Sequence, residues 1–152
     1  MTKYKIGITM GVFDLFHIGH LNLLKNCKTM CERLIVGVCT DEYVRTYKQK
    51  SPIFSEQDRL QIIESLRYVD EAYLVPCEQV ENKLIAWENY HFDVLFSGED
   101  WKGSDRFKKT EELFMQYGIS IEYFPYTQGI SSTLIKEKLD DYLATPPCNN
   151  QS

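Results

Sequence analysis

Short apolar runs of strand length alternate along the whole chain with longer segments whose apolar residues recur at helical spacing. Residues 5–10, 33–39, 71–75, 94–97 and 119–124 are expected to be strands. Residues 18–31, 80–90, 107–117 and 131–143 are expected to be helices, together with a helix that Ser55 begins. Because parallel strands need long crossover connections, usually helices, this alternation predicts one parallel sheet covered on both faces. The expected fold is a doubly wound α/β domain with five parallel strands.

The composition places this alternation in a single globular domain. The chain has 152 residues, of which 43% are hydrophobic and 26% charged. We expect one domain over residues 1–143 and a disordered tail over residues 144–152. No apolar run reaches the roughly 18 residues of a membrane span, and the N-terminus lacks an apolar stretch of signal-peptide length. These features predict a cytoplasmic protein that does not contact a membrane.

Charge and cysteine usage argue against two other kinds of binding site. The net charge of −5 disfavours nucleic acid, whose phosphate backbone prefers a basic face, although a small anionic substrate can still meet local cations. The cysteines are scattered, at positions 27, 31, 39, 77 and 148. Cys27 and Cys31 could share a helix face, but no second ligand pair accompanies them. We therefore expect reduced structural thiols and no protein-held metal.

The fold prediction indicates which loops matter for function. Ligands of a doubly wound sheet bind beyond the carboxyl ends of its strands, near the point where the strand order reverses. Four segments follow predicted strands and hold most of the unusual polar residues: 11–17, 40–51, 98–104 and 126–132. All four are expected to be loops, and a binding site is expected where they meet.

The first of these loops contains two of the chain's three histidines, in the stretch "GVFDLFHIGHLNLLK". His17 and His20 are three residues apart at the expected start of a helix, so they should share one face. The first turn of a helix also offers unpaired N–H groups and the positive end of the helix dipole. Gly19, which has no Cβ, should let a bulky group approach the backbone. These features together predict a phosphate site, with imidazoles as additional donors.

Four segments in order carry a resemblance to a known family. "GVFDLFHIGH" is similar to the H-x-G-H signature of the nucleotidyltransferase superfamily, and "RYVDE", "GEDW" and "YTQGISST" resemble segments of the cytidylyltransferases. The match extends from about residue 4 to residue 139. In a chain this short, it most resembles the bacterial CTP:glycerol-3-phosphate cytidylyltransferases. The resemblance implies a Rossmann-like nucleotidyltransferase fold.

The resemblance also implies roles for individual residues. His17 and His20 are expected to contact the CTP triphosphate and stabilise the transition state, and Lys48 and Lys50 to bridge CTP and the acceptor phosphate. Lys83 is the nearest match to an acceptor-binding lysine of the third helix. The remaining nucleotide-binding candidates are Gly11, Val12, Phe13, Asp100, Tyr126, Thr127, Gly129, Ile130, Ser131, Ser132 and Thr133.

Some of these residues also have simpler interpretations. Lys48 and Lys50 could belong to a solvated basic loop, and Trp101 could pack in a turn rather than stack on a base. Arg67 and Asp70 could form a structural ion pair, or Arg67 could support the site or a subunit contact, as the "RYVDE" segment does in the family.

The sequence departs from the family pattern at two places, the closing loop (residues 126–133) and the residue before Phe13. Tyr126 and Gln128 stand where the family has an arginine and an acidic residue, so the local net charge is unchanged. A guanidinium can hold two phosphate oxygens and a phenol cannot, although tyrosine could stack on a base or donate one hydrogen bond. Val12 replaces a small hydroxyl residue. These changes make the acceptor harder to assign than the nucleotide.

The expected reaction is transfer of CMP from CTP to a phosphorylated small alcohol, with release of pyrophosphate. Both reactants are anions, so positive charge and donors around the phosphates matter more than a base. Mg²⁺ is the expected cofactor, bridging phosphate oxygens with few protein ligands, and the family implies a homodimer. Glycerol 3-phosphate is the default acceptor. The alternatives are another phosphorylated acceptor, an adenylyltransferase that uses ATP, and a non-catalytic nucleotide-binding module.

Overall fold

The computed structural model describes residues 1–146 of the chain, and its centre is a five-stranded parallel sheet. The strands are β1 (Tyr4–Gly11), β2 (Cys31–Cys39), β3 (Glu71–Val75), β4 (Val94–Gly98) and β5 (Ser120–Phe124). Every neighbouring pair is parallel, in the order β3-β2-β1-β4-β5. The chain thus winds outward from β1 to one edge and then from β4 to the other. The predicted fold is confirmed, and its strand order reverses between β1 and β4.

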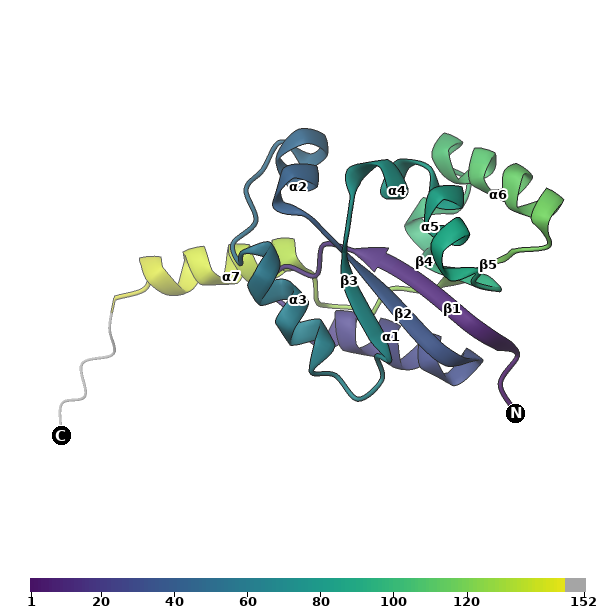
Figure 1. Cartoon of the computed structure of the whole chain (residues 1–152). Coiled ribbons are helices and arrows are strands. Elements are labelled where there is room, and N and C mark those ends of the chain that lie inside the picture. The colour runs from purple at the N-terminus through teal and green to yellow at the C-terminus, as the bar shows by residue number, and fades with distance from the viewer. Residues whose placement is uncertain (147–152) are drawn as a thin grey trace.

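Helices cover both faces of the sheet (Figure 1). On one face α1 (Ile18–Met30) and α3 (Glu56–Glu64) form a core with the strands through Leu24, Cys27 and Ile63, all fully buried. On the other face α5 (Lys83–Tyr90) and α6 (Asp105–Tyr117) pack through Ala86, Phe107 and Phe114. A smaller cluster joins α2 (Asp41–Lys48) and α4 (Cys77–Glu81) to the ends of β2 and β3.

Side-chain caps define where several helices begin, as the sequence pattern predicts. The Ser55 hydroxyl accepts the Asp58 N–H at the start of α3, and Ser131 accepts the Leu134 N–H at the start of α7 (Ser132–Ala144). Such caps satisfy backbone donors that the first helical turn leaves unpaired. At the other end of α6, Gly118 adopts a left-handed conformation (φ 70°) that favours glycine and stops the helix.

Two sequence expectations about local structure are wrong. Residues 40–51, expected to be a loop, contain α2, because Thr40 caps the Tyr43 N–H and acidic residues occupy the first turn. The single helix expected over 80–90 is divided into α4 and α5 at Asn82, whose extended backbone ends one helix while its side chain caps the next. This break places Lys83 at the buried start of α5.

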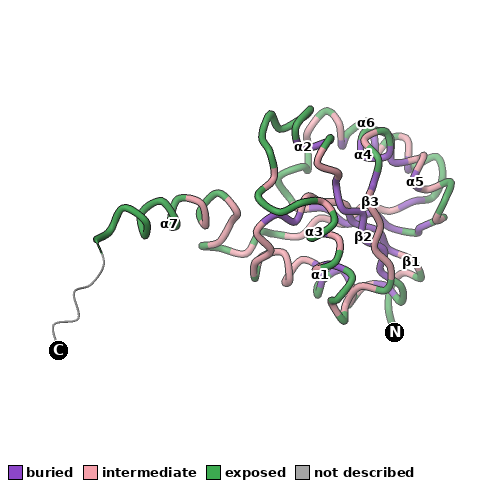
Figure 2. Tube along the Cα trace, turned by 60° about the vertical axis from the view of Figure 1, so that its left-hand side comes forward, coloured by how far each residue is buried: buried purple, intermediate pink, exposed green. Residues whose placement is uncertain are grey.

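The C-terminal helix α7 extends away from the rest of the molecule and is largely exposed (Figure 2). Of the expected tail over 144–152, Ala144 is the last residue of α7, and residues 147–152 lie outside the described part. None of the helices within residues 1–146 is long and apolar enough to cross a bilayer. The one-domain division remains a prediction.

The described cysteines are free thiols, three of them buried. Burial is the main reason that the pKa values of Cys31 and Cys39 rise to about 11, so both are inert thiols at neutral pH. Cys31 lies in β2 rather than on the helix face with Cys27. Within residues 1–146 no group of three or more His, Cys, Asp or Glu residues is placed to hold a metal ion. Cys148 lies outside the described residues.

Candidate active site

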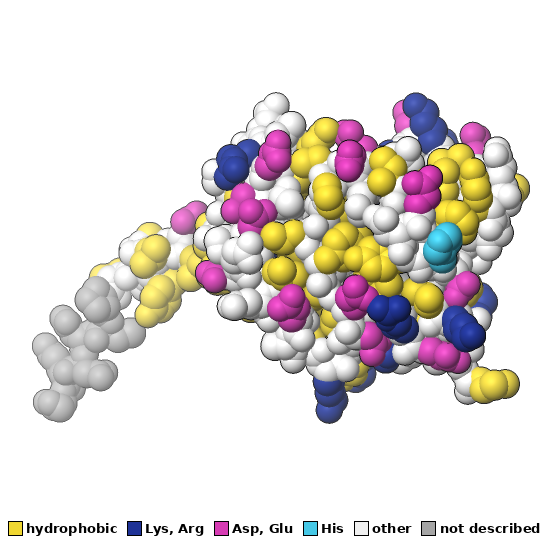
Figure 3. All heavy atoms as spheres, in the orientation of Figure 1, with side chains coloured by type: hydrophobic (Ala, Val, Ile, Leu, Met, Phe, Trp, Pro, Cys, Tyr) yellow, Lys and Arg dark blue, Asp and Glu magenta, His cyan; other side chains and the backbone are white. Residues whose placement is uncertain are grey.

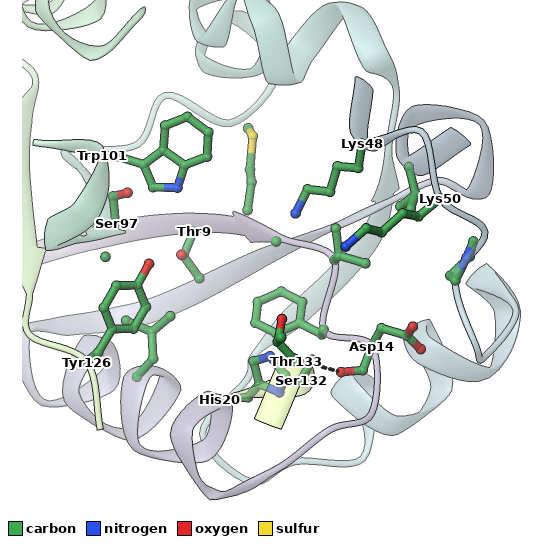
Figure 4. A pocket seen from close by; sticks show the side chains of 18 of the residues that line it. Thr9, Asp14, His20, Lys48, Lys50, Ser97, Trp101, Tyr126, Ser132 and Thr133 are labelled. Atoms are coloured by element: carbon green, nitrogen blue, oxygen red, sulfur yellow. Dashed lines mark hydrogen bonds between the residues drawn. The ribbon is translucent and has the colours of Figure 1, made fainter. Parts of the chain in front are cut away.

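A cavity of about 320 Å³ opens at the carboxyl ends of β1 and β4, where the strand order reverses. Its walls include Gly11 to Asp14, His20, Lys48, Lys50, Ser97, Gly98, Trp101, Tyr126, Ser132 and Thr133 (Figure 4). A second cavity, of about 430 Å³, adjoins it between the starts of α1 and α7 and adds His17, Thr127, Ile130 and Ser131. Residues from all four predicted segments therefore line one continuous site.

The two histidines cap the helix that they begin. His17 is the N-cap of α1, and its Nδ1 accepts the Gly19 N–H at 3.0 Å. His20 reaches back in turn, and its Nδ1 accepts the His17 N–H at 3.2 Å. This is a reciprocal capping box built from two imidazoles, whose rings stack with centroids 3.8 Å apart. The predicted shared face is confirmed.

This capping determines which ring nitrogen can serve a ligand. Because each Nδ1 accepts a backbone hydrogen, the proton of each neutral ring resides on Nε2, which is left to donate. Burial, and next the positive charge that His17 can carry, lower the pKa of His20 to about 4, and burial also lowers the pKa of His17. His20 is therefore neutral at pH 7, and both rings can present one Nε2–H to a phosphate oxygen.

The helix start differs from the prediction in one respect. The imidazoles themselves already occupy the N–H groups of His17 and Gly19, so part of the helix terminus is not free for an anion. Gly19 lines the adjoining cavity, in agreement with the predicted access to its backbone. A Cβ there would lie 2.8 Å from His17 Cε1, so glycine is also needed to admit the His17 ring.

The backbone between β1 and α1 is held in a strained shape by its own acidic residue. Phe13 and Leu15 have φ values of 56° and 50°, in the left-handed region that non-glycine residues rarely adopt. Between them, the buried Asp14 carboxylate accepts the N–H groups of Leu15, Ile53 and Phe54 at 2.7–3.1 Å. Asp14 thus fixes this loop to the segment before α3, and Ser132 donates a hydrogen bond to its carbonyl oxygen.

Two lysines extend into the cavity from the end of α2 and the residues after it (Figure 4). Lys48 is the last residue of α2, and Gln49 turns the chain with φ 52° before Lys50. Both side chains are exposed, and Lys48 lines three adjoining cavities. Neither forms an ion pair with a carboxylate within residues 1–146, so their charge is available to a ligand.

The closing loop supplies hydroxyl groups on the side opposite the lysines. Thr127 accepts a hydrogen bond from Asn22 of α1, which fixes the loop against that helix. Ser132 and Thr133 line the main cavity, and Ser131 and Ile130 line the adjoining one. Gly129 (φ 78°) shapes the turn but lines neither cavity of the described chain.

Tyr126 lies beside the acidic turn that follows β4. Gly98 has no side chain, and the Tyr126 hydroxyl and Asp100 Oδ1 both occupy the space beside it. A Cβ added at Gly98 would lie 2.9 Å from the hydroxyl and 3.1 Å from the carboxylate oxygen. Burial, and then hydrogen bonding to Asp100, raise the pKa of Tyr126. Asp100 itself lines none of the three adjoining cavities, and it contacts Tyr126 instead. Trp101 lines the cavity and also stacks on Phe107 with centroids 5.6 Å apart.

Lys83 lies deeper than the other candidates. It lines an inner cavity of about 100 Å³ that shares Lys48 and Trp101 with the main cavity. Its side chain is 5% exposed, and its Nζ donates to the Val80 carbonyl at 2.7 Å. Burial lowers the pKa of Lys83 to about 8, with Arg106 as a second cause.

Three basic residues that shape the site were not among the sequence candidates. Arg59 is fully buried and connects the ends of β1 and β2 through the Val12 and Cys39 carbonyls. Arg106 lines the inner cavity, and Lys136 lines the main one. Lys136 follows Ser132 by one helical turn, a spacing that could have indicated it. For Arg59 and Arg106 the sequence carries no such signal, since exposed arginines are the common case.

The "RYVDE" segment leads into the amino end of β3, whereas these cavities lie at the carboxyl ends of the strands. Of the alternatives considered for this segment, the Arg67–Asp70 ion pair is not formed within residues 1–146. Asp70 instead pairs with Lys28 at 2.5 Å and accepts the Leu34 N–H, whereas Arg67 is exposed and donates to the Tyr68 hydroxyl. Within one chain, therefore, Arg67 does not reach the site.

Known proteins of similar sequence and structure identify the family of this chain. The glycerol-3-phosphate cytidylyltransferase of Bacillus subtilis (strain 168) is 38% identical over 132 residues, which cover 87% of this chain and 95% of that protein. The FAD synthase of Thermococcus kodakarensis is 34% identical over 112 residues, covering 74% and 72% of the two chains. Among solved structures, the lipopolysaccharide core biosynthesis protein of Thermoplasma volcanium GSS1 matches with a TM-score of 0.66 at 27% identity, over 82% of this chain and 97% of that one.

The resemblance in the four sequence segments is therefore confirmed across most of the chain. The cytidylyltransferase-like family matches residues 8–138, a span that runs from within β1 into α7 and includes every cavity residue described above. The chain belongs to the cytidylyltransferase-like family of nucleotidyltransferases.

Proposed function

We propose that this protein transfers CMP from CTP to glycerol 3-phosphate and releases pyrophosphate. The observation that carries the proposal is the placement of two neutral histidines and two unpaired lysines around two adjoining cavities at the strand-order reversal, with His20 and Lys48 lining both. The relatives named glycerol-3-phosphate cytidylyltransferase support the choice of nucleotide and acceptor.

In this reaction an oxygen of the acceptor phosphate attacks the α-phosphorus of CTP, and the bond to the β-phosphate oxygen breaks. The nucleophile is already ionised at neutral pH, so no base is needed. The Nε2–H groups of His17 and His20 would donate to the oxygens on which charge accumulates. Because both rings are held by their own caps, these donors are oriented before the substrate arrives.

Lys48 and Lys50 would offset the repulsion between the two anionic reactants. Lys48 lies where the main, adjoining and inner cavities meet, so its ammonium is placed to touch both CTP and the acceptor. The hydroxyls of Ser132 and Thr133 and the neighbouring Thr127 would hold the nucleotide from the other side.

We propose Mg²⁺ as the cofactor, held by the triphosphate itself. Asp14, the one carboxylate that lines the main cavity of the described chain, has both oxygens occupied by backbone N–H groups. Within residues 1–146 there is no cluster of three metal-ligating side chains. The ion would therefore rest on phosphate oxygens and water, and would neutralise part of the triphosphate charge.

A second candidate is the same transfer with ATP as the nucleotide. The similarity of the chain to FAD synthases supports this alternative. The decisive experiment incubates the protein with Mg²⁺, glycerol 3-phosphate and each of CTP and ATP, and measures pyrophosphate release together with the product mass. We expect CDP-glycerol to form in the incubation with CTP and no product to form in the incubation with ATP. If product formed only in the incubation with ATP, ATP would replace CTP as the proposed nucleotide. Nucleotide binding without any product would indicate a non-catalytic module.

We propose that two copies form a homodimer that acts in the cytoplasm. The apolar side chains of Leu139, Tyr142 and Leu143 on α7 are 48%, 77% and 78% exposed in the single chain, and Figure 3 shows hydrophobic side chains along this helix. Such a surface is typical of a contact with another chain. Sedimentation equilibrium should give twice the chain mass, and a Tyr142→Lys, Leu143→Lys variant should give the single mass if α7 forms the contact.

A further inference from the structure

The inner cavity ends in two cations that no carboxylate neutralises. Lys83 is 5% exposed, and Arg106 lines the same cavity from α6. Neither side chain lies within 4.0 Å of a carboxylate oxygen in residues 1–146. Glu81 lines an outer groove with both but pairs with neither. Two neighbouring positive charges without a counter-charge are unfavourable for the free protein, which indicates that a ligand compensates them.

The positions of both side chains are set by aromatic and carbonyl groups rather than by opposite charges. Lys83 Nζ lies 5.1 Å from the centre of the Phe107 ring and donates to the Val80 carbonyl. The Arg106 guanidinium lies 5.8 Å from the centre of the Trp101 ring and donates to the Tyr43 hydroxyl at 3.3 Å. These contacts orient the cations without using up their charge.

The inner cavity also has the right place and size for one end of an acceptor. It shares Met10 to Val12, Lys48, Ser97 and Trp101 with the main cavity, but the histidines do not line it. The phosphates would react near His20 and Lys48, so a group that continues past Lys48 enters the inner cavity. Its volume of about 100 Å³ corresponds to about three water molecules at roughly 30 Å³ each, enough for a group of a few heavy atoms.

We propose that Arg106 is a specificity-determining residue which, with Lys83, makes the end of the acceptor subsite positive, so that the enzyme accepts phosphorylated polyols and excludes phosphorylated amino alcohols. Hydroxyl oxygens can accept hydrogen bonds from both cations, whereas an ammonium group at this end would meet two like charges. The inference rests on the proposed function for the location of the acceptor, and adds the chemistry of the end remote from its phosphate.

Direct binding tests this selectivity without requiring turnover. Glycerol 3-phosphate and ethanolamine phosphate, which are of similar length and share the phosphate, are titrated into the protein by calorimetry, with and without saturating CDP. Wild-type protein is expected to bind glycerol 3-phosphate at least tenfold more tightly. In Arg106→Gln this preference should fall at least fivefold, and in Arg106→Glu it should reverse. The matched control is Lys108→Gln, an exposed residue of α6 that lines none of the described cavities and should behave as wild type.

A second variant separates binding from folding. Lys83→Met replaces a buried, unpaired cation with an apolar side chain of similar length, so it should raise the urea midpoint of unfolding while weakening glycerol 3-phosphate binding at least tenfold. Equal binding of the two acceptors by wild-type protein, or an unchanged preference in the folded Arg106→Glu variant, would overturn the inference. Selective binding without CMP transfer would instead contradict the proposed function and leave the inference standing.

Discussion

Each imidazole of the HxGH pair uses its two nitrogens for different purposes. Nδ1 completes the cap of α1, and Nε2–H is left for a phosphate oxygen. The histidines are therefore required both for the shape of the loop and for its proposed chemistry. An alanine substitution removes both at once, so a loss of activity in that variant alone would not identify the cause.

Asparagine can separate the two roles at position 17. The Oδ1 of His17→Asn can replace Nδ1 as the acceptor for the Gly19 N–H, since asparagine is a good N-cap, but the variant has no Nε2–H. We expect His17→Asn to fold with nearly wild-type stability and to lower kcat about 10²–10³-fold, the usual loss for one transition-state donor. The measurements are urea unfolding and the initial rate of pyrophosphate release.

The control for this prediction is an N-cap whose side chain lines none of the three adjoining cavities. Ser55→Ala removes the N-cap of α3 and should cost about 1 kcal/mol of unfolding free energy with little effect on kcat. His17→Ala should show both effects together. If His17→Asn kept wild-type turnover, the ring would matter for the cap alone.

The half-buried His20 makes stability depend on pH. Its pKa falls from 6.5 to about 4 because of burial and then of the charge that His17 can carry. Between pH 4 and pH 6.5 the unfolded chain therefore binds a proton at this histidine more tightly than the folded chain does. The stability that neutral His20 contributes is complete above about pH 6.5 and is lost as the pH falls toward 4. The loss is at most about 3 kcal/mol. Urea unfolding at pH 7 and pH 4.5 should show a larger drop for wild type than for His20→Gln, and equal drops would contradict the assignment.

At the scale of elements, one buried arginine connects the pieces that surround the cavity. Arg59 of α3 donates to the carbonyls of Val12, Cys39 and Phe54 and pairs with Asp41 at the start of α2 at 2.6 Å. The ends of two strands and the start of the lysine-bearing helix are thus joined by a single guanidinium. No other side chain has five donors in one plane to serve all of these acceptors.

Removing this guanidinium should therefore be costly. Arg59→Met leaves buried acceptors without a donor, and we expect it to lower the free energy of unfolding by about 3–5 kcal/mol. Arg33→Met, which breaks the largely exposed pair with Glu71, should cost at most about 1 kcal/mol. Urea unfolding of both variants measures the difference. Similar costs for the two would mean that the buried network contributes no more than a surface ion pair.

The sequence predicted the strands better than it predicted the helices around the site. All five strands were identifiable, and β2 and β4 stood out because strands buried on both faces of a parallel sheet require continuous apolar runs. The helix α2 was missed because its residues are mostly polar, and only the Thr40 cap indicates it. The break at Asn82 was missed because apolar spacing continues across it.

The candidate site shows the same division between local and long-range information. Local motifs placed His17, His20 and the hydroxyls of the closing loop correctly around a cavity. The burial of Arg59 and the approach of Arg106 to Lys83 depend on how helices pack across large sequence separations, which no local pattern records. The tautomer of the histidines likewise follows from backbone geometry alone.

At the scale of the whole molecule, the cavity joins both halves of the sheet. Its walls come from β1, α1 and α2 on one side of the strand-order reversal and from β4 and the loop before α7 on the other. A nucleotide bound there would add contacts between two halves that the β1–β4 pairing and both large core clusters already join. The stability of the native protein should therefore be coupled to nucleotide binding.

We expect CTP with Mg²⁺ at 100 times its Kd to add about 2.7 kcal/mol to the free energy of unfolding, because the unfolded chain has no cavity to bind it. For a chain of this size that corresponds to a rise in Tm of roughly 5–10 °C, measurable by calorimetry. At the same CTP concentration, Lys48→Gln should show a smaller rise, since it lacks an unpaired cation where three cavities meet. Lys138→Gln, an exposed change on α7 outside the cavities, should keep the wild-type rise. Equal shifts for the two lysine variants would mean that the triphosphate does not lie between Lys48 and the histidines.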